Sequence, residues 1–170
     1  DYRGRVVFVS KGADADFTRP AIVGGLGRVT HWVAASSAAL PPFDGLVDRT
    51  QITIIPNGIN PEHCRPTLPR TQARRLLGFR EDETVCAFVG RHSAEKRPVL
   101  LAQALTVLPP EYRGLWVGTG PDEARNRAEI ARLLNGRAVF VPTVDAVGTI
   151  LAAADVIVAP SLMEGFCYTF

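Results

Sequence analysis

From residue 84 onward, short apolar runs alternate with helical patterns, and this alternation limits the fold more than any other feature of the sequence. The apolar runs are TVCAFVG (84–90), GLWVG (114–118), AVFVP (138–142) and DVIVAP (155–160). Helical patterns separate them at about 98–108, 121–135 and 146–154. Strands that are apolar throughout and separated by helices form parallel sheets covered on both faces. The sequence therefore predicts an α/β fold with a doubly wound, Rossmann-like parallel sheet.

The first part of the chain contains three further apolar runs, RVVFV, HWVAAS and QITII, which we interpret as strands. The segment PNGINPEHCRPT then breaks the pattern with three prolines and the pair Asn57-Gly58. Such a pair indicates either a tight turn or a hinge between domains. Its position between the two sets of strands favours the hinge, and we predict a linker over residues 57–80.

Composition excludes several classes of function. The net charge is +2, and no basic run accompanies it, so we expect no nucleic-acid partner. Cys64, Cys86 and Cys167 lie far apart and lack metal-ligand spacing, so we predict no metal site, no disulfide framework and a reducing, cytoplasmic location. No apolar stretch reaches the ~18 residues of a membrane span. Because the chain starts at Asp1 and its only methionine is Met163, we expect it to be a segment of a longer protein.

A ligand site is expected where the strand order of the sheet reverses. In a doubly wound sheet, ligands bind there, beyond the carboxyl ends of the first and fourth strands. The loops after these strands are GRHSAEKRP and SLMEGF, so Arg91, Lys96 and Glu164 should converge on one crevice. Lys96 is one of only two lysines in a chain with 17 arginines. Taken alone, Arg91 and Lys96 would suit a solvated loop; together with this placement they favour a site for an anion.

The chemistry of this loop suits a diphosphate. An arginine fork and a lysine charge beside a helix N-terminus are typical phosphate ligands. The loop lacks both Gly-x-Gly-x-x-Gly and the Gly-Lys-Ser/Thr of a P-loop, so it is neither a dinucleotide fingerprint nor a Walker motif.

Four segments in order resemble family 4 glycosyltransferases of the GT-B fold. FVGRHSAEKRPVLLAQAL is similar to the first strand, loop and helix of their C-terminal domain, and IIPNGIN to the segment that leads into it. LWVGTGPDEA resembles the second strand and its glycine turn, and AADVIVAPSLMEGF the start of the Glu-x7-Glu motif. The resemblance implies a GT-B type sheet that is incomplete at both ends. Residues 1–56 would end an N-terminal, acceptor-side domain, and 81–170 would form a truncated nucleotide-sugar-binding domain.

The resemblance also implies roles for single residues. Arg91 and Lys96 would hold the donor phosphates and stabilise the leaving nucleoside diphosphate, and Glu164 would lie near the donor sugar, which gives a catalytic set of three. The remaining residues of the implied donor site are Gly90, Gly118, Gly120, Val144, Gly165 and Phe166. The second glutamate of the motif would fall two positions beyond Phe170. Two departures from the family pattern, Arg97 and Pro142 in place of glycines, leave the base of a UDP-, GDP- or ADP-sugar open.

The implied function is a retaining transfer of a sugar from a nucleotide sugar to a carbohydrate, lipid or small-molecule acceptor, without a metal or cofactor. Two alternatives stay open: a nucleotide-sugar epimerase of the GT-B fold, and a non-catalytic module that binds sugar nucleotides. Membrane association of the parent protein and self-association of the segment through exposed apolar surface also stay open. We interpret His31, His63 and His92 as structural or solvated.

Overall fold

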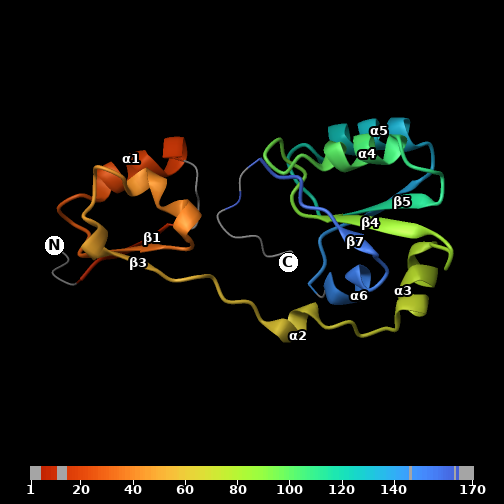
Figure 1. The fold of residues 1–170 in the computed structure, drawn as a ribbon, viewed down its shortest axis with the longest axis horizontal. Helices are drawn as coiled ribbons and strands as arrows, with labels where there is room; N and C mark the ends of the chain where they lie inside the picture. Colours follow the sequence, from red (N-terminus) through yellow and green to blue (C-terminus); the bar gives the residue numbers. More distant parts are fainter. Residues whose placement is uncertain (1–4, 11–14, 146, 163, 165–170) are drawn as a thin grey trace. The chain divides into compact units, whose positions relative to one another are not determined.

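The computed structural model of the protein describes residues 5–10, 15–145, 147–162 and 164 (Figure 1). These residues belong to two compact units, each with its own parallel sheet. The first unit runs up to Ile59 and also includes Glu164, and the second runs from Asn60 to Leu162. The assignment of these units to acceptor and donor domains stays a prediction.

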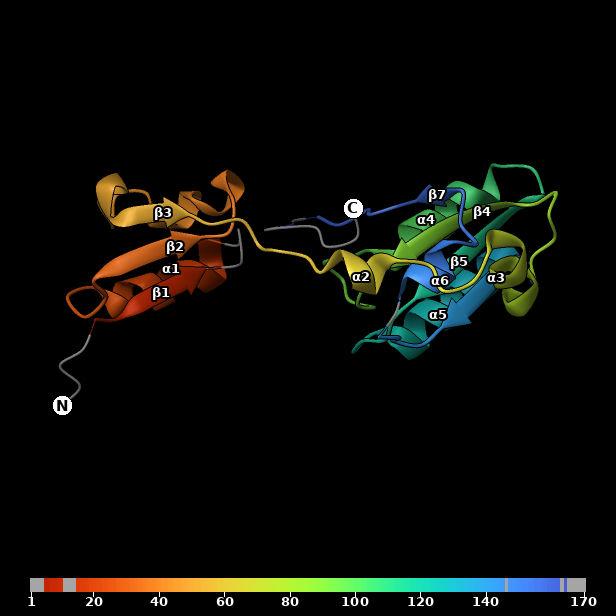
Figure 2. The ribbon, with the colours of Figure 1, turned by 90° about the horizontal axis from the view of Figure 1, so that it is seen from below.

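The first unit contains a three-stranded sheet in the order β1-β2-β3 (Figure 2). Its elements are β1 (Val7–Ser10), α1 (Ala15–Gly25), β2 (His31–Ala34) and β3 (Ile52–Ile54), with single-turn 3-10 helices η1 (Ser37–Ala39), η2 (Pro41–Phe43) and η3 (Arg49–Gln51). Its core forms around Ile22, Trp32 and Phe43, all nearly inaccessible to solvent.

Side chains alternate between the two faces of β1. Phe8 points into the core and lies against Trp32, with ring centroids 5.1 Å apart. Val7 and Val9 point the other way and are each 55% exposed. This face of β1 therefore presents apolar side chains to solvent, and self-association through exposed apolar surface stays a prediction.

The second unit contains a four-stranded parallel sheet in the order β6-β5-β4-β7. Its elements are α2 (Pro61–Cys64), α3 (Arg70–Leu77), β4 (Thr84–Val89), α4 (Pro98–Thr106), β5 (Tyr112–Val117), α5 (Glu123–Leu134), β6 (Ala138–Val141), α6 (Val147–Leu151) and β7 (Val156–Ile157). Because β7 pairs with β4 and not with β6, the strand order reverses between β4 and β7. The predicted doubly wound sheet is confirmed.

Helices cover both faces of this sheet, with α4 and α5 on one side and α3 and α6 on the other (Figure 1). The alternation of side chains along β4 explains the two cores. Cys86 and Phe88 pack toward α4 and α5, around Leu105 and Ile130. Val85 and Ala87 pack in the other cluster, which includes residues of α3 and α6. Buried apolar side chains on both faces account for the continuous apolar runs in the sequence.

The helix ends follow local sequence rules. Pro98 is the first residue of α4, where its missing N–H costs nothing. Asn135 closes α5 in the left-handed conformation, with φ of 41°. In the described part of the chain, no helix combines the length and apolar character of a membrane span.

Part of the predicted linker is folded. Residues 57–80 contain α2 and α3, and Ala73 and Phe79 are buried in the core of the second unit. α3 lacks a clear apolar stripe because its largest buried side chain is Arg74, which is 1% exposed. The fourth strand is also shorter than the predicted 155–160, since only Val156 and Ile157 pair with β4.

Candidate functional site

The loops after β4 and β5 are joined through their backbones at the carboxyl edge of the second sheet. The His92 N–H donates to the Thr119 carbonyl at 2.9 Å, and the Asp122 N–H donates to the His92 carbonyl at 3.0 Å. The end of β4 is tied to the end of β5 in the same way, because the Gly90 N–H donates to the Val117 carbonyl at 3.0 Å. The loop that carries Arg91 and Lys96 therefore has a fixed place beside the β5–α5 loop.

Two glycines make this close approach of the loops feasible. A Cβ on Gly118 would lie 2.3 Å from the Gly90 carbonyl oxygen, and the φ of Gly118 is +127°. A Cβ on Gly120 would lie 2.6 Å from both the nitrogen and the oxygen of His92. Real Cβ atoms do not approach other atoms so closely. The structure thus brings together Gly90, Gly118 and Gly120, although their contact with a donor stays a prediction.

The two predicted cations lie on either side of one carboxylate. The nearest nitrogen of Arg91 is 3.8 Å from one oxygen of Glu95, and the Lys96 ammonium is 3.7 Å from the other. The Arg91 side chain is 70% exposed, whereas that of Lys96 is 19% exposed. Lys96 is therefore a largely covered cation and not a solvated loop charge.

The segment after β7 runs along this same loop. The Leu162 N–H donates to the Glu95 carbonyl at 2.9 Å. This contact places the loop after the fourth strand beside the loop after the first, as the reversal of strand order requires. Glu164 follows two residues later and is half-buried. Its convergence with Arg91 and Lys96 stays a prediction, and Gly165 and Phe166 lie outside the described residues.

The loop after β6 reaches the same edge of the sheet. The hydroxyl groups of Thr119 and Thr143 are 3.1 Å apart, which links it to the β5–α5 loop. Val144 packs against the core on the α3 and α6 side, so its backbone is held near this edge. In the described ranges, histidine, cysteine and carboxylate side chains do not gather in groups of three that could hold a metal ion.

His92, interpreted from the sequence as structural or solvated, is a buried structural residue. Its side chain is 1% exposed and packs edge-to-face on Phe88, with ring centroids 6.0 Å apart. Burial lowers the pKa of His92, Glu123 acts to raise it and Arg127 acts to lower it further. The sequence contained a hint of this burial. Cys86, Phe88 and His92 all occupy even-numbered positions, and the side chains of Cys86 and Phe88 point into the core.

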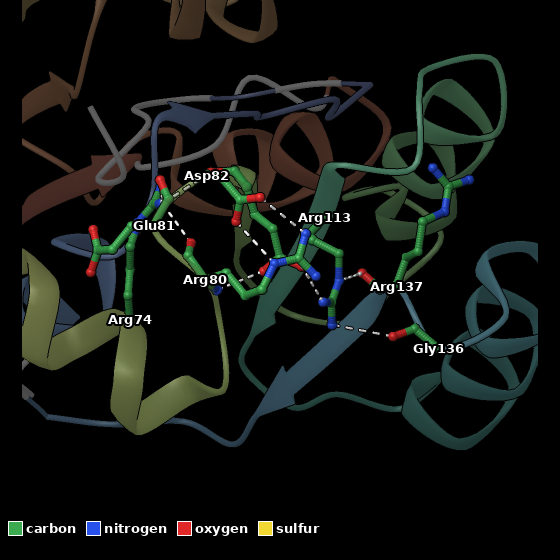
Figure 3. Close-up of polar contacts among 8 residues, drawn as sticks. Arg74, Arg80, Glu81, Asp82, Arg113, Gly136 and Arg137 are labelled. Carbon is green, nitrogen blue, oxygen red and sulfur yellow. Dashed lines mark hydrogen bonds and ion pairs between the residues drawn. The ribbon is translucent and has the colours of Figure 1, made fainter.

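A depression of about 610 Å³ lies at the opposite, amino edge of the sheet. Figure 3 shows polar contacts among the residues at this edge. Its charges neutralise one another: Arg113 pairs with Glu83 at 2.8 Å, and Arg80 pairs with Asp82 at 2.9 Å. Arg113 also donates to the Gly136 carbonyl at 3.2 Å. Burial acts to raise the pKa of Glu83, but hydrogen bonds from the Arg80 N–H and Arg113 hold it below its usual range. We interpret the network of Arg80, Asp82, Glu83 and Arg113 as structural, since these four groups pair with one another.

Comparisons with known proteins show the family and the fold of the chain. The model of the family "Glycosyl transferases group 1" matches residues 69–170. A D-inositol 3-phosphate glycosyltransferase from Mycobacteroides abscessus is 35% identical over 127 residues, which cover 70% of this chain and 28% of that protein. A UDP-Gal:alpha-D-GlcNAc-diphosphoundecaprenol alpha-1,3-galactosyltransferase from Escherichia coli is 29% identical over 127 residues, 70% of this chain and 33% of that protein. The chain thus spans a third or less of the length of these relatives.

Solved structures show the same fold. HepE from Anabaena, in complex with UDP and glucose, has a TM-score of 0.82 and 22% identity, over 94% of this chain and 47% of HepE. WaaG, a glycosyltransferase involved in lipopolysaccharide biosynthesis, has a TM-score of 0.72 and 21% identity, over 82% of this chain and 40% of WaaG. The resemblance seen in the sequence is confirmed. The chain therefore belongs to the group 1 glycosyl transferases and has the α/β fold of GT-B enzymes.

Proposed function

We propose that the protein containing this chain transfers a sugar from a nucleotide-sugar donor to an acceptor with retention of configuration. In this proposal the chain supplies the cations that hold the donor diphosphate. One observation carries it: Arg91 and Lys96 flank Glu95 on a single loop, at the edge where the strand order reverses. Retention of configuration rests on the family resemblance.

The two cations suit the charge change during transfer. The bond between the anomeric carbon and a diphosphate oxygen breaks, and negative charge grows on the departing nucleoside diphosphate. Arg91 offers a planar fork for two oxygens, and Lys96 offers a compact charge. Positive groups fixed where charge develops favour the transition state over the ground state. Glu95 lies near both cations before the donor binds, and Glu164 would bind the donor sugar.

Relatives support a uridine nucleotide among the three bases left open. HepE has been solved with UDP and with UDP-glucose, and the name of the Escherichia coli relative specifies UDP-Gal. The names of relatives also include a lipid-linked acceptor and inositol 3-phosphate. We therefore propose a UDP-sugar as donor, and a lipid-linked or small phosphorylated sugar or polyol as acceptor.

The test is the substitution Lys96→Ala in the full-length protein, with sugar transfer, UDP binding and thermal melting measured together. A charge-assisted contact contributes roughly 1.5–3 kcal/mol, so kcat/KM should fall about tenfold to a hundredfold. Melting should stay nearly unchanged, because Lys96 is not part of the hydrophobic clusters of the second unit. Arg132→Ala is the matched control, since this exposed cation lies in the last turn of α5. Normal transfer and normal melting of Lys96→Ala would contradict the proposal.

A further inference from the structure

The loop that carries Arg91 and Lys96 contains an unusual pair of buried polar atoms. In the described part of the chain, the buried side-chain atoms without a hydrogen-bond partner are His92 Nδ1 and Ser93 Oγ. A buried polar atom without a partner destabilises the folded protein, so such atoms are uncommon. In the sequence, both residues stand between Arg91 and Lys96, the two cations of the proposed donor site.

The His92 ring lies at the point where the two loops meet. Its backbone N–H bonds to the β5–α5 loop at Thr119, and its carbonyl accepts the N–H of Asp122 from the same loop. Gly120 leaves no room between them, since a Cβ there would lie 2.6 Å from the His92 backbone. The ring packs on Phe88 beneath these bonds. Displacement of the ring would therefore move both bonds, and with them the residues on either side of position 92.

We propose that His92 is a positioning residue of the donor site. Its buried, neutral ring holds the 90–97 loop against the 118–122 loop, a contact that we call the clamp, and so sets the spacing of Arg91 and Lys96. Protonation of the ring opens the clamp and weakens donor binding. This inference rests on the proposed function of the site. In this inference His92 acts on the positions of the two cations through the backbone of the loop, and it need not touch the donor.

The surroundings of the ring favour its neutral form. The charged groups that act on His92 are Glu123 and Arg127, both from α5, while β4 contributes the apolar Phe88. A protonated imidazole has two N–H donors, and Nδ1 has no acceptor in the folded loop. A buried charge without a partner is strongly unfavourable, so the proton would be accommodated by opening of the loop.

The direction of the pH effect follows from linkage. Burial lowers the pKa of His92 below its ordinary 6.5, so the closed loop prefers the neutral ring. Binding is therefore undiminished above pH 6.5 and weakens as the pH falls through the lowered pKa. For one linked proton, the affinity falls by at most about tenfold per pH unit below that pKa.

The experiment measures the dissociation constant of UDP by calorimetry, from about pH 7.5 down to about pH 5. It compares the full-length wild type with His92→Leu, His92→Ala and the control His31→Gln. His31 lies on β2 of the first unit, bonded to the Thr53 hydroxyl at 2.7 Å, so its removal should leave the profile unchanged. Phosphate groups of UDP titrate near pH 6 themselves, and this shared effect is removed by taking ratios between variants.

The two His92 variants separate packing from protonation. Leucine fills a similar space without titrating, so His92→Leu should bind UDP at about pH 7.5 within roughly threefold of the wild type and lose the extra weakening in acid. Alanine removes the packing on Phe88, so His92→Ala should bind roughly tenfold more weakly even at neutral pH. Wild-type and His92→Leu profiles that coincide would overturn the pH effect, and wild-type affinity in a folded His92→Ala would overturn the clamp.

Amide hydrogen exchange distinguishes failure of this inference from failure of the proposed function. If UDP does not bind to the wild type at any pH in this range, the proposed function fails. The clamp is then tested without ligand, through the exchange of the His92 and Asp122 amides. Both should be protected at neutral pH and lose protection in acid in the wild type, but not in His92→Leu. Equal protection across the pH range in the wild type would overturn the inference.

Discussion

At the scale of single residues, Gly120 and Gly78 are both required, but only Gly120 shapes the carboxyl edge. Gly120 is needed because the backbone of His92 occupies the space where its Cβ would be. Gly78 is needed for a different reason, since its φ is +74° but nothing lies within 4 Å of a Cβ built there. The first is a requirement of loop packing, and the second is a requirement of backbone conformation alone.

Substitution of alanine for each of these two glycines should have different consequences. Gly120→Ala should lower the free energy of unfolding by about 1–3 kcal/mol and, by separating the loops, weaken UDP binding by roughly tenfold or more. Gly78→Ala should cost roughly 1 kcal/mol of stability and leave UDP binding unchanged. Chemical denaturation and calorimetry on both variants make the comparison. Equal losses of UDP affinity would show that the loop junction has no special role.

The same residues show why the sequence predicts part of the site. Arg91, Lys96, Gly118 and Gly120 could be placed because each lies in a loop that follows a strand, and parallel strands end at one edge. The partnership of the cations with Glu95 could not be predicted, because it depends on the side-chain conformations of one turn. The burial of His92 agrees with its interpretation as structural, but its place where the two loops meet could not be predicted, because it depends on the backbone that follows Val89, the last residue of β4.

At the scale of elements, α4 begins with a strained residue. Arg97 precedes Pro98 and has a φ of 52°, a conformation that disfavours residues with a Cβ. Asn135 at the end of α5 has a φ of 41°, but asparagine tolerates this region better. The sequence position where the family often has glycine is thus a position where glycine would fit the backbone.

Relief of this strain should stabilise the protein. We expect Arg97→Gly to raise the free energy of unfolding by roughly 0.5–1 kcal/mol, because the gain in the folded state exceeds the added freedom of the unfolded chain. Arg97→Ala removes the same side chain but keeps the strain, so it should give no gain. Asn135→Gly should give a smaller gain than Arg97→Gly. Denaturant titration of the three variants tests this order, and a destabilised Arg97→Gly would mean that the guanidinium group itself supports the loop.

Elements with a strong apolar pattern could be predicted, and those without one could not. The strands and helices from β4 to β6 match the predicted ranges closely, since their buried faces are continuous. Helix α1 was missed because Pro20 lies inside it and two glycines end it. Helix α3 was missed because its place in the fold depends on a buried arginine, which no periodicity of apolar residues reveals.

At the scale of the whole second unit, Asp155, which directly precedes β7, ties β4 and α3 together at the amino edge of the sheet. It accepts the Val85 N–H of β4 at 2.7 Å and pairs with Arg70 and Arg74 of α3. Arg74 also donates to the carbonyl groups of Ala153 and Glu83. Burial acts to raise the pKa of Asp155, but the Val85 N–H and the two guanidinium groups hold it below 3.8.

This arrangement predicts a loss of stability in acid. Because the folded pKa is lowered, the stabilisation is complete above pH 3.8 and is lost as the pH falls through the lower, folded value. Asp155→Asn should leave the buried Arg74 without its carboxylate. Since the Asp155 side chain is 31% exposed, screening reduces the cost to roughly 2 kcal/mol at neutral pH.

Thermal melting of Asp155→Asn and the wild type between about pH 7 and pH 3 tests this prediction. The difference between them should narrow in the acid range, where the wild-type carboxylate also becomes neutral. Asp82→Asn is the control, because Asp82 forms an exposed pair with Arg80 and should have no measurable effect. A constant difference across the pH range would mean that the ion pairs of Asp155 do not contribute to folding.

The position of β7 in the sheet also sets the order in which the second unit assembles. β4 and β5 share six register pairs and are close in sequence, whereas β7 adds two register pairs and joins β4 from some 70 positions away. Closure of a long loop for so few contacts is slow, so β7 should dock after β4, β5 and β6 have formed. The carboxyl edge where β4 and β7 lie side by side is then completed only in the last folding step. A chain still being synthesised would hold both cations of the site well before it could bind a donor.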